Sequence, residues 1–137
     1  MVHVQYIEEH LLKILYSAGE KLNTRNIGGI GEERAIRYLK NNEFKIVKQN
    51  YRCKVGEIDI IALKDNILRF IEVKYRKDES YGCPYEAVTG KKQNKIFKVS
   101  SWFLNENRQF ENIQCSFDVI SITDHRIEYI FNCFGAM

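Results

Sequence analysis

The sequence GEIDIIALKDNILRFIEVK, residues 56–74, decides the fold because it contains two β-strand patterns joined by a tight turn. Isoleucine, valine and phenylalanine dominate both halves, as is typical of strands. The dipeptide Asp-Asn at 65–66 separates the halves and favours a turn. The stretch therefore predicts a β-hairpin. Yet Asp59, Glu72 and Lys74 lie within strands whose apolar composition indicates burial, where charge is rare.

A two-residue turn at 65–66 fixes which residues face each other across this hairpin. It places Asp59 opposite Glu72 and Glu57 opposite Lys74, with all four side chains on one face. Two carboxylates about 5 Å apart repel by roughly 3 kcal/mol at an effective dielectric constant near 20. A bound Mg²⁺ or Mn²⁺ would offset this repulsion. Two alternatives stay open: an exposed face with a Glu57–Lys74 surface pair, or a one-residue slip that separates the acids.

The surrounding sequence predicts an α/β domain with a mixed β-sheet and helices packed on it. Apolar residues at helical spacing predict an amphipathic helix over 4–18. The stretch NTRNIGGIG then indicates a connector. Further helices are predicted over 31–41 and 91–104, and strands over 44–52, 56–63, 67–76, 117–122 and 126–134.

Length and composition indicate one ordinary globular domain. The chain has 137 residues, of which 45% are hydrophobic and 28% charged, and a formal net charge of +3. Its four cysteines form no CxxC pair and its three histidines are scattered, which argues against a zinc site. With no signal peptide and no apolar run as long as a membrane span, we expect a cytoplasmic protein with reduced thiols and no membrane association.

A third acidic residue of interest lies on the predicted helix before the hairpin. Glu32 falls on the apolar, inward-facing stripe of that helix. It is either a metal ligand or an acid in the first helical turn, which the helix dipole would stabilise by about 0.3–1 kcal/mol. Lys74, two residues after Glu72, could orient a metal-activated water and stabilise negative charge that develops on a phosphate.

Basic residues surround these motifs. Lys91, Lys95 and Lys98 are spaced to lie on one side of the predicted third helix, and Arg76 follows the strand that carries Lys74. Such groups attract phosphate backbones without sequence specificity, and neighbouring tyrosines could stack on unpaired bases. Each group alone is more often a solvated surface, but beside a carboxylate site it indicates nucleic-acid binding.

Asp59 followed by Glu72-Val73-Lys74 resembles the signature of the PD-(D/E)xK nuclease superfamily, which includes restriction endonucleases and archaeal Holliday-junction resolvases. Ile58 stands where the full signature has proline. The ordered motifs GEERAIRYL, GEIDIIA, FIEVKYR, YGCPYEAV, KKQ and FDVI resemble more closely the YraN-like family of small bacterial proteins.

This resemblance implies a restriction-endonuclease-like core over residues 24–137, with residues 1–23 as an N-terminal helical extension. It also implies roles for individual residues. Asp59 and Glu72 would be catalytic ligands of Mg²⁺ or Mn²⁺, Lys74 the catalytic lysine, and Glu32 an additional metal ligand. Lys92 and Gln93 match a helix motif that contacts the substrate or the site in similar nucleases.

The leading hypothesis is therefore a metal-dependent endonuclease that hydrolyses DNA rather than RNA, with branched or repair intermediates as candidate substrates. The alternative is a non-catalytic nucleic-acid-binding module that serves DNA repair or recombination. A third hypothesis is an assembly protein built around the N-terminal helix, with a homodimer as one form. In the first two cases the residues expected to contact nucleic acid are Arg76, Lys91, Lys92, Gln93 and Lys95.

Overall fold

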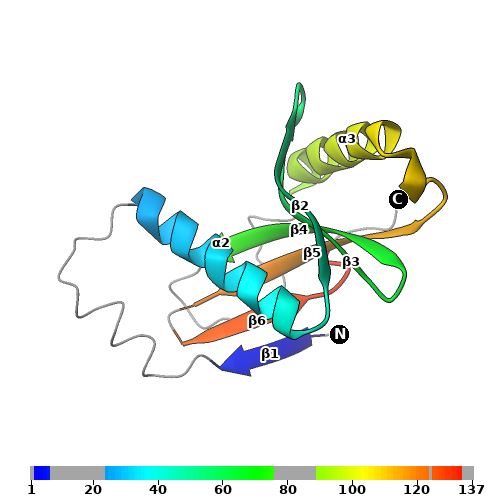
Figure 1. The fold of residues 1–137 in the computed structure, drawn as a ribbon. Coiled ribbons are helices and arrows are strands. Elements are labelled where there is room, and N and C mark those ends of the chain that lie inside the picture. Colours follow the sequence, from blue (N-terminus) through cyan, green and yellow to red (C-terminus); the bar gives the residue numbers. More distant parts are fainter. Residues whose placement is uncertain (1, 7–23, 76–88, 124, 134–137) are drawn as a thin grey trace.

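The computed structural model describes residues 2–6, 24–75, 89–123 and 125–133. The elements are β1 Val2–Tyr6, α2 Thr24–Asn41, β2 Lys45–Cys53, β3 Gly56–Lys64, β4 Ile67–Tyr75, α3 Gly90–Glu106, a short 3₁₀ helix Arg108–Phe110, β5 Gln114–Ile122 and β6 Arg126–Ile130. Within these residues the strands form a six-stranded sheet in the order β1-β6-β5-β4-β3-β2 (Figure 1). None of the described helices is long and apolar enough to cross a membrane.

The sheet is mixed. Neighbouring strands are antiparallel except β4 and β5, which run parallel. A parallel pair needs a long crossover, and α3 lies in the connection between these two strands. The prediction of a mixed β-sheet flanked by helices is confirmed, and the arrangement is consistent with a restriction-endonuclease-like core.

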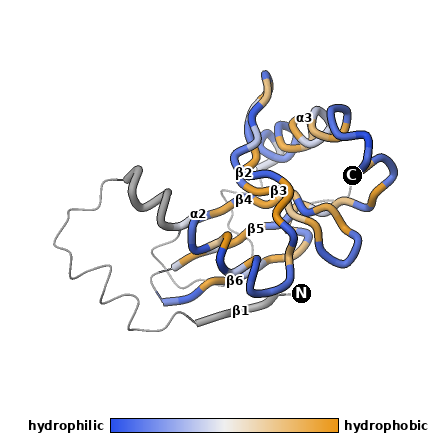
Figure 2. The backbone as a smooth tube through the Cα atoms, in the orientation of Figure 1, coloured by the Kyte–Doolittle hydropathy of each residue, from blue (hydrophilic) through white to orange (hydrophobic). Residues whose placement is uncertain are grey.

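Two apolar clusters pack on the sheet, one with each helix. Ile61 belongs to the cluster that contains Phe103 of α3, whereas its neighbour Ile60 belongs to the cluster that contains Leu39 of α2. Successive strand residues point to opposite faces, so the two helices cover opposite faces of the sheet. Figure 2 shows the apolar run of β3 and the alternation of apolar and polar residues along α3.

The register of the predicted hairpin is confirmed over its turn-proximal half. The pairs run from Lys64 opposite Ile67 to Ile60 opposite Ile71, as a turn centred on 65–66 requires. Both turn residues have positive φ, 53° and 60°. This conformation suits a two-residue hairpin turn of type I′, which asparagine and aspartate tolerate better than most residues.

The structure corrects two helix predictions. Residues 4–6 belong to β1, which pairs with β6, and not to a helix over 4–18. Alternation of apolar and polar residues in VHVQY is the strand signal that the helical pattern masked. Residues 7–18 lie outside the described part. The second helix starts at Thr24 rather than at residue 31, so residues 24–31 of the predicted connector belong to the helix despite the weak helix preference of its glycines.

The prediction of reduced thiols holds for two cysteines. Cys53 and Cys115 are free. Cys133 is disulfide-bonded, so for this residue the prediction is wrong. Cys83 lies outside the described residues.

A buried polar cluster joins β4, β5 and β6 around Asp118, which is fully buried. Its carboxylate accepts hydrogen bonds from the Tyr129 hydroxyl, the Asn132 backbone N–H at 2.8 Å and the Ser116 hydroxyl at 3.2 Å. The Arg69 guanidinium lies 3.6 Å from the same carboxylate. Burial raises the pKa of Asp118, and these partners oppose that effect. The cluster thus neutralises a charge that the core could not otherwise hold.

We expect Asp118→Ala to lower the free energy of unfolding by about 3–5 kcal/mol, because it leaves the buried Arg69 cation without its carboxylate. Ser116→Ala removes only one neutral donor and should cost about 1 kcal/mol. Urea unfolding of both variants measures the difference. Equal losses would show that the ion pair is not what stabilises this part of the sheet.

Candidate functional site

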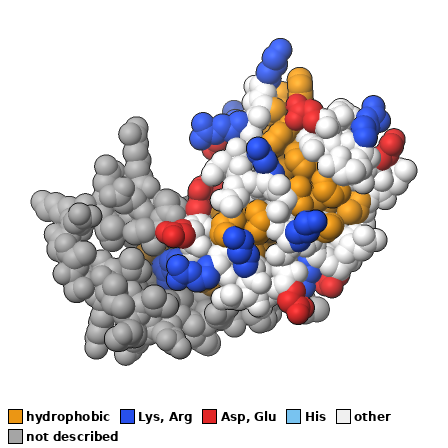
Figure 3. Space-filling view, in the orientation of Figure 1, with side chains coloured by type: hydrophobic (Ala, Val, Ile, Leu, Met, Phe, Trp, Pro, Cys, Tyr) orange, Lys and Arg blue, Asp and Glu red, His pale blue; other side chains and the backbone are white. Residues whose placement is uncertain are grey.

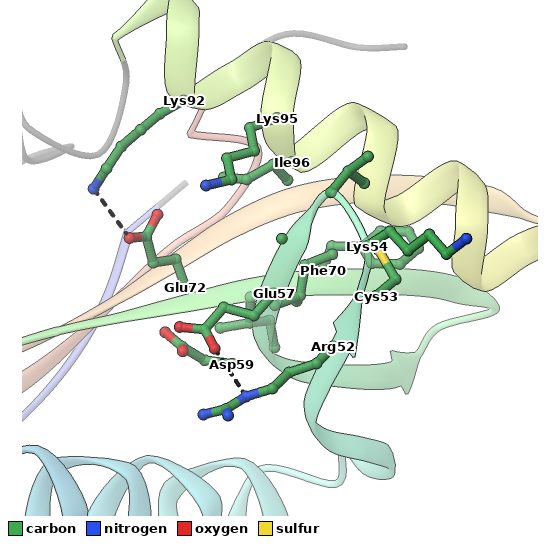
Figure 4. Close-up of a pocket in the computed structure, with 14 residues that line it drawn as sticks. Arg52, Cys53, Lys54, Glu57, Asp59, Phe70, Glu72, Lys92, Lys95 and Ile96 are labelled. Atoms are coloured by element: carbon green, nitrogen blue, oxygen red, sulfur yellow. Dashed lines mark hydrogen bonds and ion pairs between the residues drawn. The ribbon is translucent and has the colours of Figure 1, made fainter.

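A cleft of about 560 Å³ lies between the β2–β3 hairpin, β4 and α3. Figure 3 shows Lys and Arg side chains spread over the hairpin and α3, with an apolar area between them. Figure 4 shows the cleft's carboxylates on the strands and Lys92 reaching toward them from α3. The charged residues that line the cleft are Arg52, Lys54, Glu57, Asp59, Glu72, Lys92 and Lys95.

The cleft opens where β3 leaves β4. The last pair of their ladder is Ile60 with Ile71. Immediately beyond it, the Asp59 carboxylate accepts a hydrogen bond from the Val73 backbone N–H at 2.9 Å. From there β3 pairs only with β2, and the two form a hairpin that rises beside α3 (Figure 1). Ile58 consequently packs in the α3 cluster, whereas simple alternation predicts it on the other face.

The position of the β2–β3 hairpin depends on its close approach to α3. Gly56 has a φ of 156°, and a Cβ at this position would lie 2.8 Å from Cε of Lys95 and 3.2 Å from Cγ2 of Val99. Val99 is fully buried and cannot easily move away. Glycine therefore lets the hairpin lie against α3 and close one end of the cleft.

Glu72 forms ion pairs with two lysines. Its Oε1 lies 3.6 Å from Nζ of Lys74 and 3.4 Å from Nζ of Lys92, and its side chain is 22% exposed. Oε2 is buried and has no hydrogen-bond partner within the described part of the chain. A buried oxygen without a partner costs about 1–3 kcal/mol or more when charged, so a ligand at this atom is favoured.

Asp59 lies in an environment that disfavours its charge. Burial is the largest cause and raises the pKa of Asp59 to about 6, although the Val73 N–H opposes the shift. The negative charges of Glu72, Glu32 and Glu57 raise it further. A cation near Asp59 would relieve both the desolvation and the repulsion.

The predicted pairing of Glu57 with Lys74 is wrong. Glu57 pairs instead with Arg52 at 3.0 Å, and Lys74 pairs with Glu72. The predicted pair needs the β3–β4 ladder to continue for three more residue pairs beyond Ile60–Ile71, and the ladder ends before them. The exposed-face alternative fits Glu57, whose side chain is 59% exposed, but not Lys74, at 26%.

The alternative explanation of Glu32, an acid in the first turn of its helix, is wrong. Helix α2 begins at Thr24, and Glu32 lies near its middle. Its charge reaches Asp59, but it does not line the cleft. In the described ranges no group of three or more histidine, cysteine or acidic side chains is arranged to hold a metal. Asp59 and Glu72 remain as a pair. That pair fits Mg²⁺, which often takes one or two carboxylates and completes its shell with water and phosphate.

Only some of the residues expected to contact nucleic acid lie at the cleft. Lys92 and Lys95 line the cleft. Lys91 is exposed and Gln93 partly buried on α3, and neither lines the cleft. Arg76 lies outside the described residues.

Two features of the cleft were missed from the sequence. One is the wall that residues 52–58 form opposite α3. The signal for it was the Lys54-Val55-Gly56 turn between two strand patterns, directly before the acidic strand. The other is the contact of Lys92 with Glu72, which joins residues far apart in the sequence and had no sequence signal.

The sequence model of a protein family, the Uncharacterised protein family UPF0102, matches residues 31–122. The chain belongs to this family. The resemblance to YraN-like proteins is thereby confirmed, and the match spans the predicted site residues from Glu32 to Lys95.

Several UPF0102 proteins are similar to this chain over most of its length. One from Caldanaerobacter subterraneus subsp. tengcongensis is 37% identical over 122 residues, which cover 84% of this chain and 99% of the relative. One from Lachnoclostridium phytofermentans is 39% identical over 115 residues, covering 84% and 98%. One from Clostridium botulinum is 40% identical over 116 residues, covering 80% and 94%. These names give the family and no activity.

We expect the stability of this UPF0102 chain to depend on the ionisation of Asp59. Its pKa is about 6 in the folded protein and 3.8 ordinarily, so ionisation between these values favours unfolding. Neutral Asp59 therefore favours the folded state. This contribution to the free energy of unfolding is complete below the ordinary pKa of 3.8 and is lost as the pH rises through the folded-state pKa of about 6. Asp59→Asn cannot ionise, so its advantage over wild type should grow from near zero at about pH 4 to roughly 2–3 kcal/mol at about pH 8.

Urea unfolding at both pH values, with a chelator present, measures this difference. Asp65→Asn is the matched control, because it makes the same chemical change in the exposed hairpin turn. Its difference from wild type should stay nearly constant with pH. An Asp59→Asn advantage that does not grow with pH would contradict the assigned environment.

Proposed function

We propose that this protein is a divalent-metal-dependent nuclease that hydrolyses DNA phosphodiester bonds, with branched or repair intermediates as its substrates. The observation that carries the proposal is the pairing of two carboxylates in one cleft. Asp59 and Glu72 come from adjacent strands. The pKa of Asp59 is raised, and Glu72 has a buried oxygen with no hydrogen-bond partner among the described residues. Lys74 lies beside them.

Asp59 and Glu72 would hold Mg²⁺ or Mn²⁺, which supplies phosphate polarisation and water activation when bound. The lysines contribute separately. Lys74 Nζ, held 3.6 Å from Glu72, would orient the attacking water and stabilise negative charge on the phosphate. Lys92 and Lys95 project from α3 into the same cleft, where they would position the DNA backbone (Figure 4).

Lys92 also links metal binding to DNA binding. It lies 3.4 Å from Glu72 Oε1, the carboxylate that a metal would need. Phosphate oxygens compete with Glu72 for this ammonium group, so DNA binding would free Glu72 for the metal. A bound metal would in turn free Lys92 for phosphate. Each ligand therefore favours the other, a reciprocal coupling of the two sites.

We expect Asp59→Ala and Lys74→Ala each to lower metal-dependent DNA cleavage by at least about 100-fold, because each removes a group that acts on the reacting phosphate. The assay is cleavage of a panel of labelled linear, flapped and four-way-junction DNA with Mg²⁺ or Mn²⁺. Glu111→Gln, an exposed acid paired with Arg108 away from the cleft, is the control and should retain activity. Unchanged cleavage by either cleft variant would refute its assigned role.

We expect Lys92→Ala to bind Mn²⁺ up to roughly 5-fold more tightly than wild type without DNA, because it removes a competitor for Glu72. The same variant should bind DNA more weakly. Electron paramagnetic resonance of free Mn²⁺ measures the first effect, and Asp59→Asn should abolish binding. Lys91→Ala loses the same charge from an exposed neighbouring position and is the matched control. Equal metal affinities of the two lysine variants would contradict the competition.

One observation favours a second function, a non-catalytic nucleic-acid-binding module. Two lysines already contact Glu72, and the described residues assemble no three-ligand metal group. Such a module would bind DNA equally well with and without divalent metal. Asp59→Asn would leave this binding unchanged or tighten it slightly, and no Mn²⁺ would bind even with DNA present.

A further inference from the structure

Trp102 on α3 is the one large apolar side chain in the described ranges that is exposed, at 40%. It is also the only tryptophan of the chain. A single exposed aromatic residue is common on protein surfaces and needs no function. Its position relative to the basic residues of α3 gives it significance.

Lys91, Lys95, Lys98 and Trp102 are spaced by four, three and four residues, so they follow one side of α3. All four are exposed. The buried residues of α3, among them Val99 and Phe103, point to the sheet instead. We call these four residues the lysine–tryptophan row. It is a line of positive charge that ends at an aromatic ring.

The row continues from the cleft. Lys95 belongs to both, and Lys92 contacts Glu72 from the first turn of the same helix. Figure 4 shows Lys92 and Lys95 directed to the cleft side of α3. The acid nearest the far end of the row, Glu106, accepts a hydrogen bond from the Tyr51 hydroxyl at 2.9 Å. An anionic chain that enters the cleft therefore has a basic path outward along α3.

We propose that the lysine–tryptophan row binds an unpaired strand of nucleic acid that leaves the cleft, with the lysines on its phosphates and Trp102 stacked on a base. The path of the strand through the cleft rests on the proposed function. Charge complementarity selects a polyanion, and stacking on an aromatic ring selects unpaired bases, since the faces of bases inside a duplex are covered.

Helix geometry sets the length of the path. Trp102 lies ten residues beyond Lys92, or about 15 Å along α3 at 1.5 Å per residue. A stacked strand advances about 3.4 Å per nucleotide. Trp102 therefore meets a base roughly four nucleotides from the phosphate held by Lys92.

The fluorescence of Trp102 tests the proposal, because no other tryptophan contributes to it. The full chain is titrated, with a chelator present, with a mixed-sequence single strand of about 12 nucleotides and with the matching duplex. We expect the single strand to quench the emission and the duplex to do so far less. Trp102→Ala should weaken single-strand binding about 5- to 150-fold, measured by anisotropy of a labelled strand. Trp102→Phe keeps an aromatic face and should recover most of that loss.

The outcomes test strand binding by the lysine–tryptophan row separately from the proposed nuclease activity. Absent quenching with unchanged affinity of Trp102→Ala overturns this inference, whether or not metal-dependent cleavage is found. Equal quenching by the duplex overturns the assignment to unpaired strands. Emission that changes with protein concentration but not with nucleic acid assigns Trp102 to a contact between copies of the chain and also overturns it. Quenching and a Trp102→Ala defect without any cleavage keep the row and reject the nuclease.

Discussion

The hydrogen bond from the Val73 N–H to the Asp59 carboxylate is the constraint on which the cleft depends. It takes a backbone donor of β4 just beyond the last pair of the β3–β4 ladder, so β3 can diverge while that donor stays satisfied. The divergence lets the β2–β3 hairpin lie against α3, and the space between them is the cleft. Because burial of Asp59 disfavours its charge and raises its pKa, a cation bound beside it would stabilise the ionised carboxylate.

The carboxylates of the buried polar cluster and of the cleft differ in how completely their oxygens are hydrogen-bonded. Asp118 has four polar partners, of which Arg69 on β4 and Tyr129 on β6 tie it to both neighbouring strands, so this carboxylate serves stability. In the part of the chain that the structure describes, Glu72 keeps one oxygen without a partner although two lysines are close to the other. Incomplete satisfaction of a partly buried carboxylate lowers stability, and such exceptions are concentrated at functional sites.

The hairpin register could be predicted because turn chemistry and strand alternation are local, and the structure reproduces it from Ile60 to Ile71. The end of the ladder could not, because it depends on a side-chain acceptor that competes with a backbone one. For the same reason Glu57 was assigned the wrong partner. The contact of Lys92 with Glu72 depends on how α3 crosses the sheet, which periodicity does not encode. Strand β1 was hidden because its five residues carry alternation beside a longer helical pattern.

Under the proposed function, two carboxylates would be a weak metal site by themselves. The lysines beside Glu72 would compensate, because a bound phosphate can draw them away from the carboxylate. Asp59 and Glu72 offer oxygen ligands, whereas Lys74 and Lys92 keep Glu72 neutralised until a stronger partner arrives. A DNA phosphate would bring both a ligand for the metal and an acceptor for Lys92. Metal and DNA would then assemble together in the cleft, and hydrolysis would require the correct strand to be present. Under the proposed function, the metal would bind tightly only once a nucleic-acid phosphate has taken Lys92 from Glu72.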